Sequence, residues 1–149
     1  MALEIRRMTT LDAGLEEALA RLLPQLSGGL RAPSREVLGR LLAQPCAALL
    51  AALDGERIVG VLTLVWYDVP SGRKGWVEDV VVDAGERGRG VGRLLVEKAL
   101  GLARSEGVQH LMLTSNPARR AAHALYRTCG FEEVGSTLFR FDMNKKVDL

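Results

Sequence analysis

A loop rich in glycine and arginine is the part of the chain whose residue types point most directly to chemistry. It follows the β-branched run Val80–Val82, extends from Arg87 to Gly92, and has glycine at positions 88, 90 and 92. The apolar period then becomes helical, so the loop leads from a buried strand into a helix. The free N–H groups and positive dipole end of a helix N-terminus bind anions, and glycine lets an anion reach the backbone. We therefore predict an anion site, with a closely packed turn as the alternative.

Two familiar phosphate-binding motifs do not fit this loop. A P-loop ends in Gly-Lys-Ser/Thr, whereas this loop ends in Gly92-Arg93-Leu94. The dinucleotide fingerprint requires a sixth-position glycine, but counting from Gly88 places Arg93 there. The pattern that remains is R-x-x-G-x-G, which Arg87, Gly90 and Gly92 supply.

Three further side chains could carry acid–base chemistry. Glu78 and Asp79 open the strand that leads to the loop, and adjacent acids on a buried strand are unfavourable unless they face a cleft or are paired. Strand alternation predicts that they point to opposite faces, with a salt bridge at the strand end as the alternative role. Tyr126 lies near the end of a predicted helix. Its phenol, with an ordinary pKa of about 10, could donate a proton or could simply pack in the core.

The elements that must position these residues form a mixed α/β domain. We expect strands over residues 3–8, 47–53, 57–67, 76–82 and 110–114, with two short strands near 132–134 and 138–143. Asp54-Gly55 indicates a hairpin, and residues 70–75 read as a loop. The strand over 57–67 is apolar on both faces, which is typical of the middle of a sheet. The strand over 110–114 should be parallel to its predecessor, because a helix intervenes.

Four helices are expected between these strands. The first is capped by Thr10 and ended by Pro24, and the second starts at about Ser34 and stops at Gln44. The third extends from Val91 to about Ser105, with apolar residues at 91, 94, 95, 99 and 102 on one face. The fourth begins at Asn116-Pro117 and stops at Gly130.

The loop and the end of the last helix together resemble the GCN5-related N-acetyltransferase (GNAT) superfamily. The R-x-x-G-x-G loop resembles its pyrophosphate loop, and Leu125-Tyr126 followed by Gly130-Phe131 resembles the A-x-x-L-Y-x-x-x-G-F ending of its last helix. The resemblance covers essentially the full chain. It implies a single-domain acyl-CoA N-acyltransferase fold over residues 1–149, with a mixed central sheet of about seven strands and helices on both faces. The fourth and fifth strands would splay apart around the pantetheine arm of acetyl-CoA.

The resemblance also implies roles for individual residues. Tyr126 would protonate the departing thiolate, and Glu78, preferred slightly over Asp79, would orient or deprotonate the amine. The expected acetyl-CoA contacts come from the backbone of the fourth strand, from the loop and from one arginine near the last helix: Val80, Val81, Val82, Arg87, Gly88, Arg89, Gly90, Val91, Gly92, Arg93 and Arg119. Arg119 stands where many members have an asparagine, so its contact with the coenzyme is the weakest part of this set.

The implied function is transfer of the acetyl group of acetyl-CoA to a primary amine of a small molecule or peptide. Direct attack in a ternary complex is expected, because no cysteine is placed as an acyl carrier. A non-catalytic acyl-CoA sensor or partner module is the alternative. Thr114 occupies a position where members that acetylate ribosomal-protein N-termini often have glutamate, which counts against that acceptor.

Composition narrows the other function classes. A net charge of +2 argues against nucleic-acid binding, and the longest apolar stretch, Ala47–Leu53, is too short for a membrane span. The N-terminus lacks the apolar core of a signal peptide, so we expect a cytoplasmic protein with a mobile tail over 144–149. Cys46 and Cys129 read as separate thiols, and no metal site is expected. The resemblance allows a homodimer.

Overall fold

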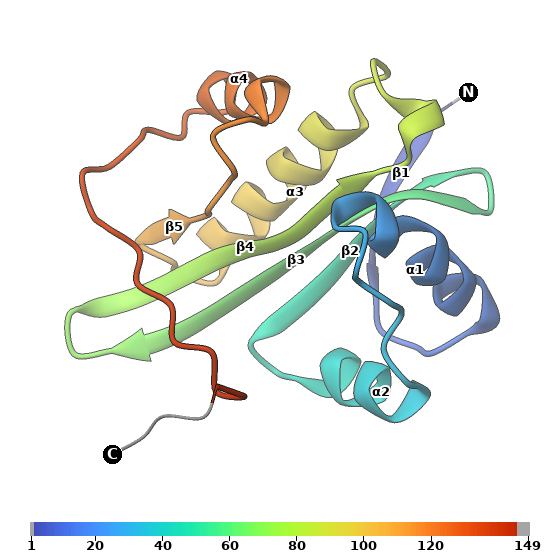
Figure 1. Cartoon of the computed structure of the whole chain (residues 1–149), viewed down its shortest axis with the longest axis horizontal. Coiled ribbons are helices and arrows are strands. Elements are labelled where there is room, and N and C mark those ends of the chain that lie inside the picture. The colour runs from blue at the N-terminus through green and yellow to red at the C-terminus, as the bar shows by residue number, and fades with distance from the viewer. Residues whose placement is uncertain (1, 146–149) are drawn as a thin grey trace.

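The computed structural model describes residues 2–145 as a five-stranded sheet with helices on both faces (Figure 1). Its elements are β1 (Leu3–Met8), α1 (Ala13–Leu26), α2 (Arg35–Ala43), β2 (Ala47–Asp54), β3 (Arg57–Val69), β4 (Gly72–Val82), a 3-10 turn (Ala84–Glu86), α3 (Val91–Ser105), β5 (His110–Met112) and α4 (Arg120–Thr128). Of the tail predicted to be mobile, residues 146–149 lie outside the described part of the chain. Within that part, no helix has both the length and the apolar character that crossing a bilayer would require.

The strands lie in the order β1-β2-β3-β4-β5, so β3 occupies the middle of the sheet as predicted. β1 to β4 pair antiparallel with their neighbours, and β5 is parallel to β4. The predicted hairpin at Asp54-Gly55 is confirmed, because Asp54 pairs with Arg57 and Gly55 has a φ of 64°. β5 pairs with β4 only between Lys74–Trp76 and His110–Met112, so the rest of β4 has one edge without a strand partner in residues 2–145.

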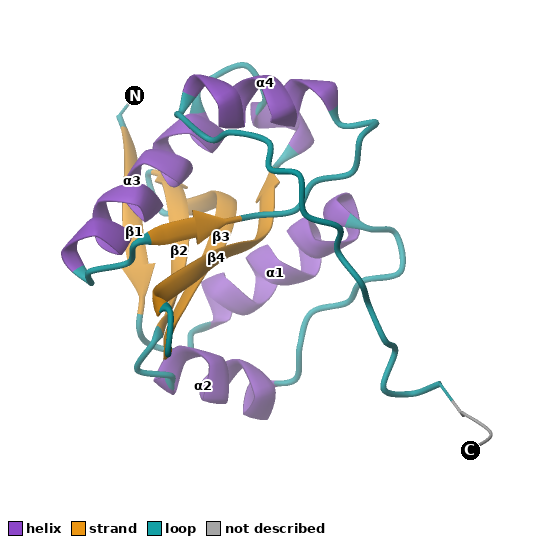
Figure 2. Ribbon diagram, turned by 90° about the vertical axis from the view of Figure 1, so that its left-hand side faces the viewer, coloured by secondary structure: helices purple, strands orange, loops and turns teal. Residues whose placement is uncertain are grey.

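The helices cover the two faces of the sheet in pairs (Figure 2). α3 and α4 lie over one face, where Leu62 and Leu64 join Leu95 of α3 in one apolar cluster. α1 and α2 lie over the other face, where Val61 joins Leu38 of α2 in a second cluster. β3 is therefore apolar on both faces because both faces are covered. Leu94 departs from the predicted helical face, since 37% of it is exposed.

The first helix begins and ends at other residues than predicted. Asp12, and not Thr10, is the N-cap, and its side chain accepts a hydrogen bond from the Leu15 N–H at 2.8 Å. Pro24 lies inside the last turn of α1, which continues to Leu26. Proline removes one backbone donor, but the Ser27 N–H still donates to the Leu23 carbonyl at 3.2 Å, so the turn is completed. The predicted start of the second helix at about Ser34 is confirmed, because α2 begins at Arg35 with Ser34 as its N-cap.

The fourth helix begins later than predicted. The Asn116 side chain accepts a hydrogen bond from the Ala118 N–H at 2.9 Å, which makes a local turn outside the helix. α4 starts only at Arg120, and Pro117 is not its first residue. The Asn-Pro pair therefore marks a turn that precedes the helix.

The hairpin between β3 and β4 is tighter than predicted. β3 reaches Val69 and β4 starts at Gly72, so the expected loop over 70–75 shrinks to Pro70 and Ser71. Gly75 lies within the strand, where an added Cβ would come within 3.1 Å of a Leu111 methyl carbon. This glycine permits close packing and does not mark a loop.

Within residues 2–145, the two C-terminal strands predicted near 132–134 and 138–143 are absent, and the sheet has five strands where about seven were expected. The described chain after α4 is irregular and exposes large apolar side chains, among them Val134 (73%), Phe139 (90%) and Met143 (84%). The alternation of apolar and polar residues made these segments candidate strands, but a strand also needs a neighbouring strand to pair with. The adjacent edge strand β5 has only three residues and ends at Met112 instead of 114, so it offers few backbone groups to pair with.

Candidate active site

The glycines of the loop before α3 fall into two kinds. Gly88 and Gly90 have φ values of 86° and 76°, and a Cβ at either would meet no heavy atom within 4 Å. Gly92 differs, because its Cβ would lie 3.1 Å from a Leu125 methyl carbon of α4. Close packing of α3 on α4 therefore explains Gly92, whereas the other two glycines serve a left-handed backbone that leaves the space outside the loop open.

The N-terminus of α3 has donors without acceptors. α1 and α2 are capped by the side chains of Asp12 and Ser34, but Gly90 at the start of α3 has no side chain to act as a cap. The first backbone hydrogen bond into α3 is donated by Leu94, to the Gly90 carbonyl at 3.1 Å. The three N–H groups of Val91–Arg93 precede that bond and donate to no carbonyl of residues 2–145. This end of α3 can therefore hold an anion by its main chain.

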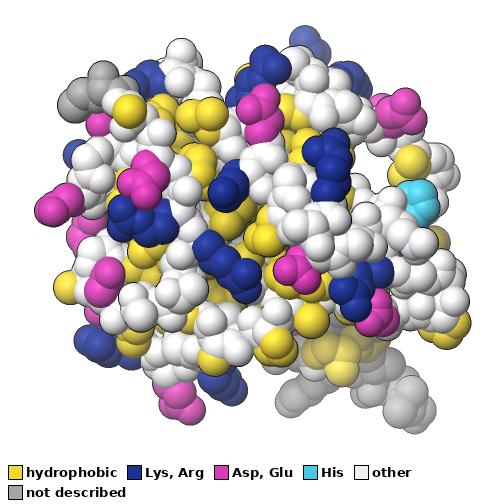
Figure 3. Space-filling model, turned by 180° about the vertical axis from the view of Figure 1, so that it is seen from behind, with side chains coloured by type: hydrophobic (Ala, Val, Ile, Leu, Met, Phe, Trp, Pro, Cys, Tyr) yellow, Lys and Arg dark blue, Asp and Glu magenta, His cyan; other side chains and the backbone are white. Residues whose placement is uncertain are grey.

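The arginines around the loop are not equivalent. Arg89 donates to Asp54 at 2.9 Å and also pairs with Glu86, while Arg93 pairs with Glu97 at 2.8 Å. Arg87 is exposed and forms no ion pair with residues 2–145. On the face of the molecule opposite to that in Figure 1, Lys and Arg side chains are also interspersed with Asp and Glu side chains (Figure 3). Of these three arginines, Arg87 has the side chain that is not already engaged by a carboxylate of the fold.

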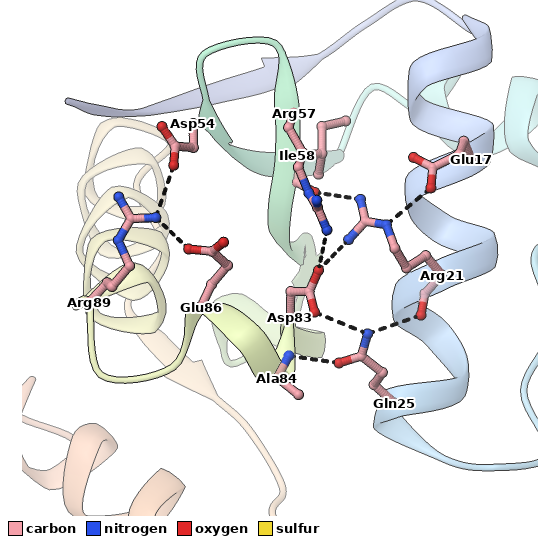
Figure 4. Close-up of polar contacts among 10 residues, drawn as sticks. All are labelled: Glu17, Arg21, Gln25, Asp54, Arg57, Ile58, Asp83, Ala84, Glu86 and Arg89. Carbon is pink, nitrogen blue, oxygen red and sulfur yellow. Dashed lines mark hydrogen bonds and ion pairs between the residues drawn. The ribbon is translucent and has the colours of Figure 1, made fainter. Parts of the chain in front are cut away.

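A network that the sequence did not reveal fastens the start of the loop to α1 (Figure 4). Asp83 follows β4 directly, and its carboxylate accepts from Arg21 at 2.6 Å and from Arg57 at 3.0 Å. Gln25 of α1 donates to the same carboxylate at 3.4 Å and accepts from the Ala84 N–H at 2.8 Å. Burial opposes the charge of Asp83, but these hydrogen bonds and the Arg21 charge outweigh it, so the pKa of Asp83 lies below its ordinary value.

Replacing Asp83 by Asn should destabilise the fold by about 2 kcal/mol at neutral pH, because it leaves the half-buried Arg21 with one carboxylate partner fewer. A carboxyl whose pKa is lowered by folding stabilises above its unfolded pKa of about 4, and that stabilisation disappears as the pH falls through the folded pKa. The difference in urea-unfolding free energy between wild type and variant should therefore shrink below pH 4. Asp68→Asn is the control, since the Asp68–Arg73 pair is exposed and should matter little. An equal effect of both variants would contradict this account.

The acidic pair lies at a β-bulge in β4. Val61 pairs with Val81 and Thr63 with Glu78, so β4 has one residue more than β3 between these pairs. Asp79 lies in the bulge with a φ of 50°, a left-handed conformation that Asp and Asn tolerate better than most residues. The bulge breaks the alternation of side chains, and Glu78 and Asp79 line the same small cavity. The alternation on which the prediction of opposite faces rests is therefore interrupted at these two residues.

That small cavity, of about 150 Å³, joins the predicted acid–base residues. Its lining comes from the end of α1, from β4, from the chain after β5 and from α4, and comprises Leu26, Val77, Glu78, Asp79, Val80, Leu113, Thr114, Arg119 and Tyr126. Arg119 is thus brought to the site, as are both acids and Tyr126. The cavity lies where β4 and the chain after β5 no longer pair.

Loss of contact with water shifts the pKa values of the two acid–base candidates, although Glu78 is exposed and Tyr126 is buried. Desolvation, aided by the neighbouring Asp79 charge, raises the pKa of Glu78. Desolvation also raises the pKa of Tyr126, and the charge of Arg119 offsets part of that rise. Tyr126 is 7% exposed and packs edge-on against Phe131, with ring centroids 6.0 Å apart. At neutral pH its hydroxyl is therefore protonated and held in a fixed ring position, so it can act as a proton donor.

A larger cavity of about 360 Å³, which is broadly open to solvent, lies beside the small one. Val65, Trp76, Glu78, Thr114 and Leu138 line it, so Glu78 and Thr114 belong to both cavities. The sequence suggested no role for Val65, Trp76 or Leu138, since apolar residues in strands read as core. Within residues 2–145, no group of three or more His, Cys, Asp or Glu side chains is arranged to hold a metal ion.

Comparison with known proteins identifies the relatives of this chain. Residues 15–131 match the Acetyltransferase (GNAT) family. Glucosamine 6-phosphate N-acetyltransferase 1 of Oryza sativa subsp. japonica is 42% identical over 62 residues, which make up 42% of this chain and 36% of that protein. Aminoglycoside N(6')-acetyltransferase type 1 of Stenotrophomonas maltophilia is 31% identical over 101 residues, or 65% of this chain and 66% of that protein. The chain thus spans less than two thirds of either relative.

Among solved structures, the fold is similar to that of AAC(6')-Iy in complex with the bisubstrate analog CoA-S-monomethyl-acetylneamine. The TM-score is 0.77 at 20% identity, covering 95% of this chain and 99% of that one. At 20% identity, this similarity shows a shared fold and nothing about the substrate.

Proposed function

Because the chain belongs to the acetyltransferase (GNAT) family, we propose that it transfers the acetyl group of acetyl-CoA to a primary amine of a small molecule or peptide. The observation that carries the proposal is the small cavity that joins Tyr126 of α4 to Glu78 of β4. β4 then leads into the uncapped, glycine-lined N-terminus of α3. An acid, a base and an anion site on neighbouring elements are what this transfer needs.

In the proposed reaction, each part of the site has one task. The free N–H groups of Val91–Arg93 hold the pyrophosphate, with Gly88 and Gly90 leaving room for it and Arg87 adding charge. The backbone of Val80–Val82 pairs with the pantetheine arm where β4 and β5 diverge, and one N–H there polarises the thioester carbonyl. Arg119 borders the small cavity that contains Tyr126, and its positive charge partly neutralises the negative charge of the bound coenzyme.

The chemical step is a direct attack in a ternary complex. The amine nitrogen bonds to the carbonyl carbon while the carbon–sulfur bond breaks, so no acyl-enzyme forms. Glu78, directly or through water, accepts the proton that the nitrogen loses. Tyr126 gives its proton to the departing sulfur, and solvent exchange restores both groups.

An acetyl-CoA-dependent thiol-release assay with a panel of amines tests the proposal. Polyamines, aminoglycosides, amino acids and peptide N-termini cover the main acceptor chemistries. We expect at least one class to release thiol well above the hydrolysis background, with acetylated amine as the second product. Tight binding of acetyl-CoA without amine-dependent release from any class would indicate a sensor and would overturn the catalytic proposal.

The pH dependence tests the role of Glu78. Because its pKa is raised, the carboxylate needed as a base forms only at a higher pH than for an ordinary glutamate. Asp79→Asn removes the neighbouring charge while keeping a side chain that tolerates the left-handed backbone, so the pKa of Glu78 should fall. The acidic limb of the kcat/KM profile should then move to lower pH, measured with one amine for both proteins. Coincident acidic limbs would remove Glu78 as the base.

A further inference from the structure

The larger cavity has a lining whose chemistry narrows the acceptor. It shares Glu78 and Thr114 with the small cavity that holds Tyr126, so it opens onto the reacting centre of the proposed function. Its other lining residues are Val65, Trp76 and Leu138, all apolar. Since the coenzyme would occupy the side of the α3 loop, this cavity is the space left for the body of the acceptor.

Its aromatic wall is fixed in place. Register pairs Val65 with Trp76, so the two side chains lie on the same face of the sheet. The Trp76 indole N–H donates to the Tyr67 hydroxyl at 2.9 Å, which satisfies the only polar atom of the indole. A satisfied donor leaves the ring faces as the surface that a ligand can contact, and such faces favour apolar and aromatic groups.

The cavity has a single charge in its lining. Glu78 is the only charged residue among the five that line it, and no Lys or Arg is present. On the adjoining β3–β4 hairpin, Asp68 is engaged by Arg73, with its two oxygens accepting at 2.7 Å and 2.9 Å. Asp79 and Arg119 line only the small cavity. In the larger one Glu78 can pair one ammonium, whereas a second ammonium or a phosphate would meet no side chain of opposite charge.

We propose, on the premise of the proposed function, that the acceptor is a monocationic primary amine with an apolar body, aromatic or branched alkyl. Its ammonium, before losing a proton, is held by Glu78, and its body lies against Trp76, Val65 and Leu138. Polycationic amino sugars and phosphorylated amino sugars fit this lining poorly, although relatives of the chain carry the names of such substrates.

A competition of matched amines tests the inference. Measured as kcat/KM by thiol release, 2-phenylethylamine and isoamylamine should exceed ethylamine by about 10- to 100-fold, because a phenyl or branched alkyl group is removed from water. Spermidine, kanamycin and glucosamine 6-phosphate should fall below 2-phenylethylamine. A preference for any of those three would overturn the inference while leaving the proposed function intact. Absence of thiol release with every amine would overturn both, and the fault would then lie with the proposed function.

Variants of Trp76 link the preference to the cavity. Trp76→Ala should lower the ratio of kcat/KM for 2-phenylethylamine to kcat/KM for ethylamine about tenfold. In Trp76→Phe, most of the wild-type ratio should be kept. Binding gives a second measurement that does not need turnover. 2-Phenylethylamine should change the tryptophan fluorescence of the wild type and not that of Trp76→Phe, which keeps only the buried Trp66. An unchanged selectivity ratio in Trp76→Ala would place the acceptor elsewhere.

Discussion

Replacing Tyr126 by Phe should lower kcat about 100-fold or more while leaving the affinity for acetyl-CoA unchanged. The hydroxyl is the only group removed, and the edge-on contact between ring 126 and Phe131, with centroids 6.0 Å apart, can persist. Burial keeps the phenol protonated at neutral pH, so the wild-type residue enters the reaction in its acid form. Without it, the sulfur must leave as an unassisted thiolate.

The measurement is kcat at saturating amine, together with the acetyl-CoA dissociation constant from calorimetry. Tyr67→Phe is the matched control, because it removes the other tyrosine hydroxyl of the chain. That hydroxyl accepts from Trp76 at the larger cavity, so its loss should affect KM for the amine far more than kcat. Equal loss of kcat in both variants, or full turnover in Tyr126→Phe, would remove Tyr126 as the acid.

Local sequence rules predicted the parts of the fold that depend on neighbouring residues. β1 and the hairpin at Asp54-Gly55 follow from alternation and turn chemistry, and α3 follows from helical periodicity ending before Gly107. The roles of Tyr126 and Gly88–Gly92 were inferred from family signatures at helix ends, and these roles remain predictions. Gly92 also depends on a distant contact, because it packs against Leu125 of α4.

The remaining features depend on contacts that are distant in sequence. The bulge that interrupts the alternation at Glu78 and Asp79 arises from pairing with β3, and alternation within β4 gives no sign of it. Arg89 reads as a ligand for phosphate, yet Asp54 of the neighbouring hairpin engages it. The apolar alternation over 138–143 satisfies every local rule for a strand, but residues 2–145 supply no partner for it.

The glycine at position 90 allows the anion site to be tested by charge alone. Asp and Asn have the same shape, both tolerate the left-handed φ of 76° better than other residues, and both can cap a helix. Gly90→Asp and Gly90→Asn should therefore fold alike, and each places a side chain over the same N–H groups of α3. The two variants differ by one negative charge. In the absence of ligand, that charge stabilises Gly90→Asp, because it lies at the positive end of the α3 dipole.

Gly90→Asp should bind acetyl-CoA about 100-fold more weakly than Gly90→Asn, since like charges about 4 Å apart near a protein surface repel by several kcal/mol before screening. The difference in affinity between the two variants should narrow as the salt concentration rises. Any loss of affinity that both variants share with respect to wild type reflects steric and capping effects, and this loss should not depend on salt. Calorimetry at low and high ionic strength measures both quantities, and thermal unfolding without ligand should place Gly90→Asp at or above Gly90→Asn. A carboxylate at the N-cap of α3 must repel an anion that is held by the next three N–H groups. Equal affinities of the two variants at low salt would therefore mean that no phosphate lies at this helix end.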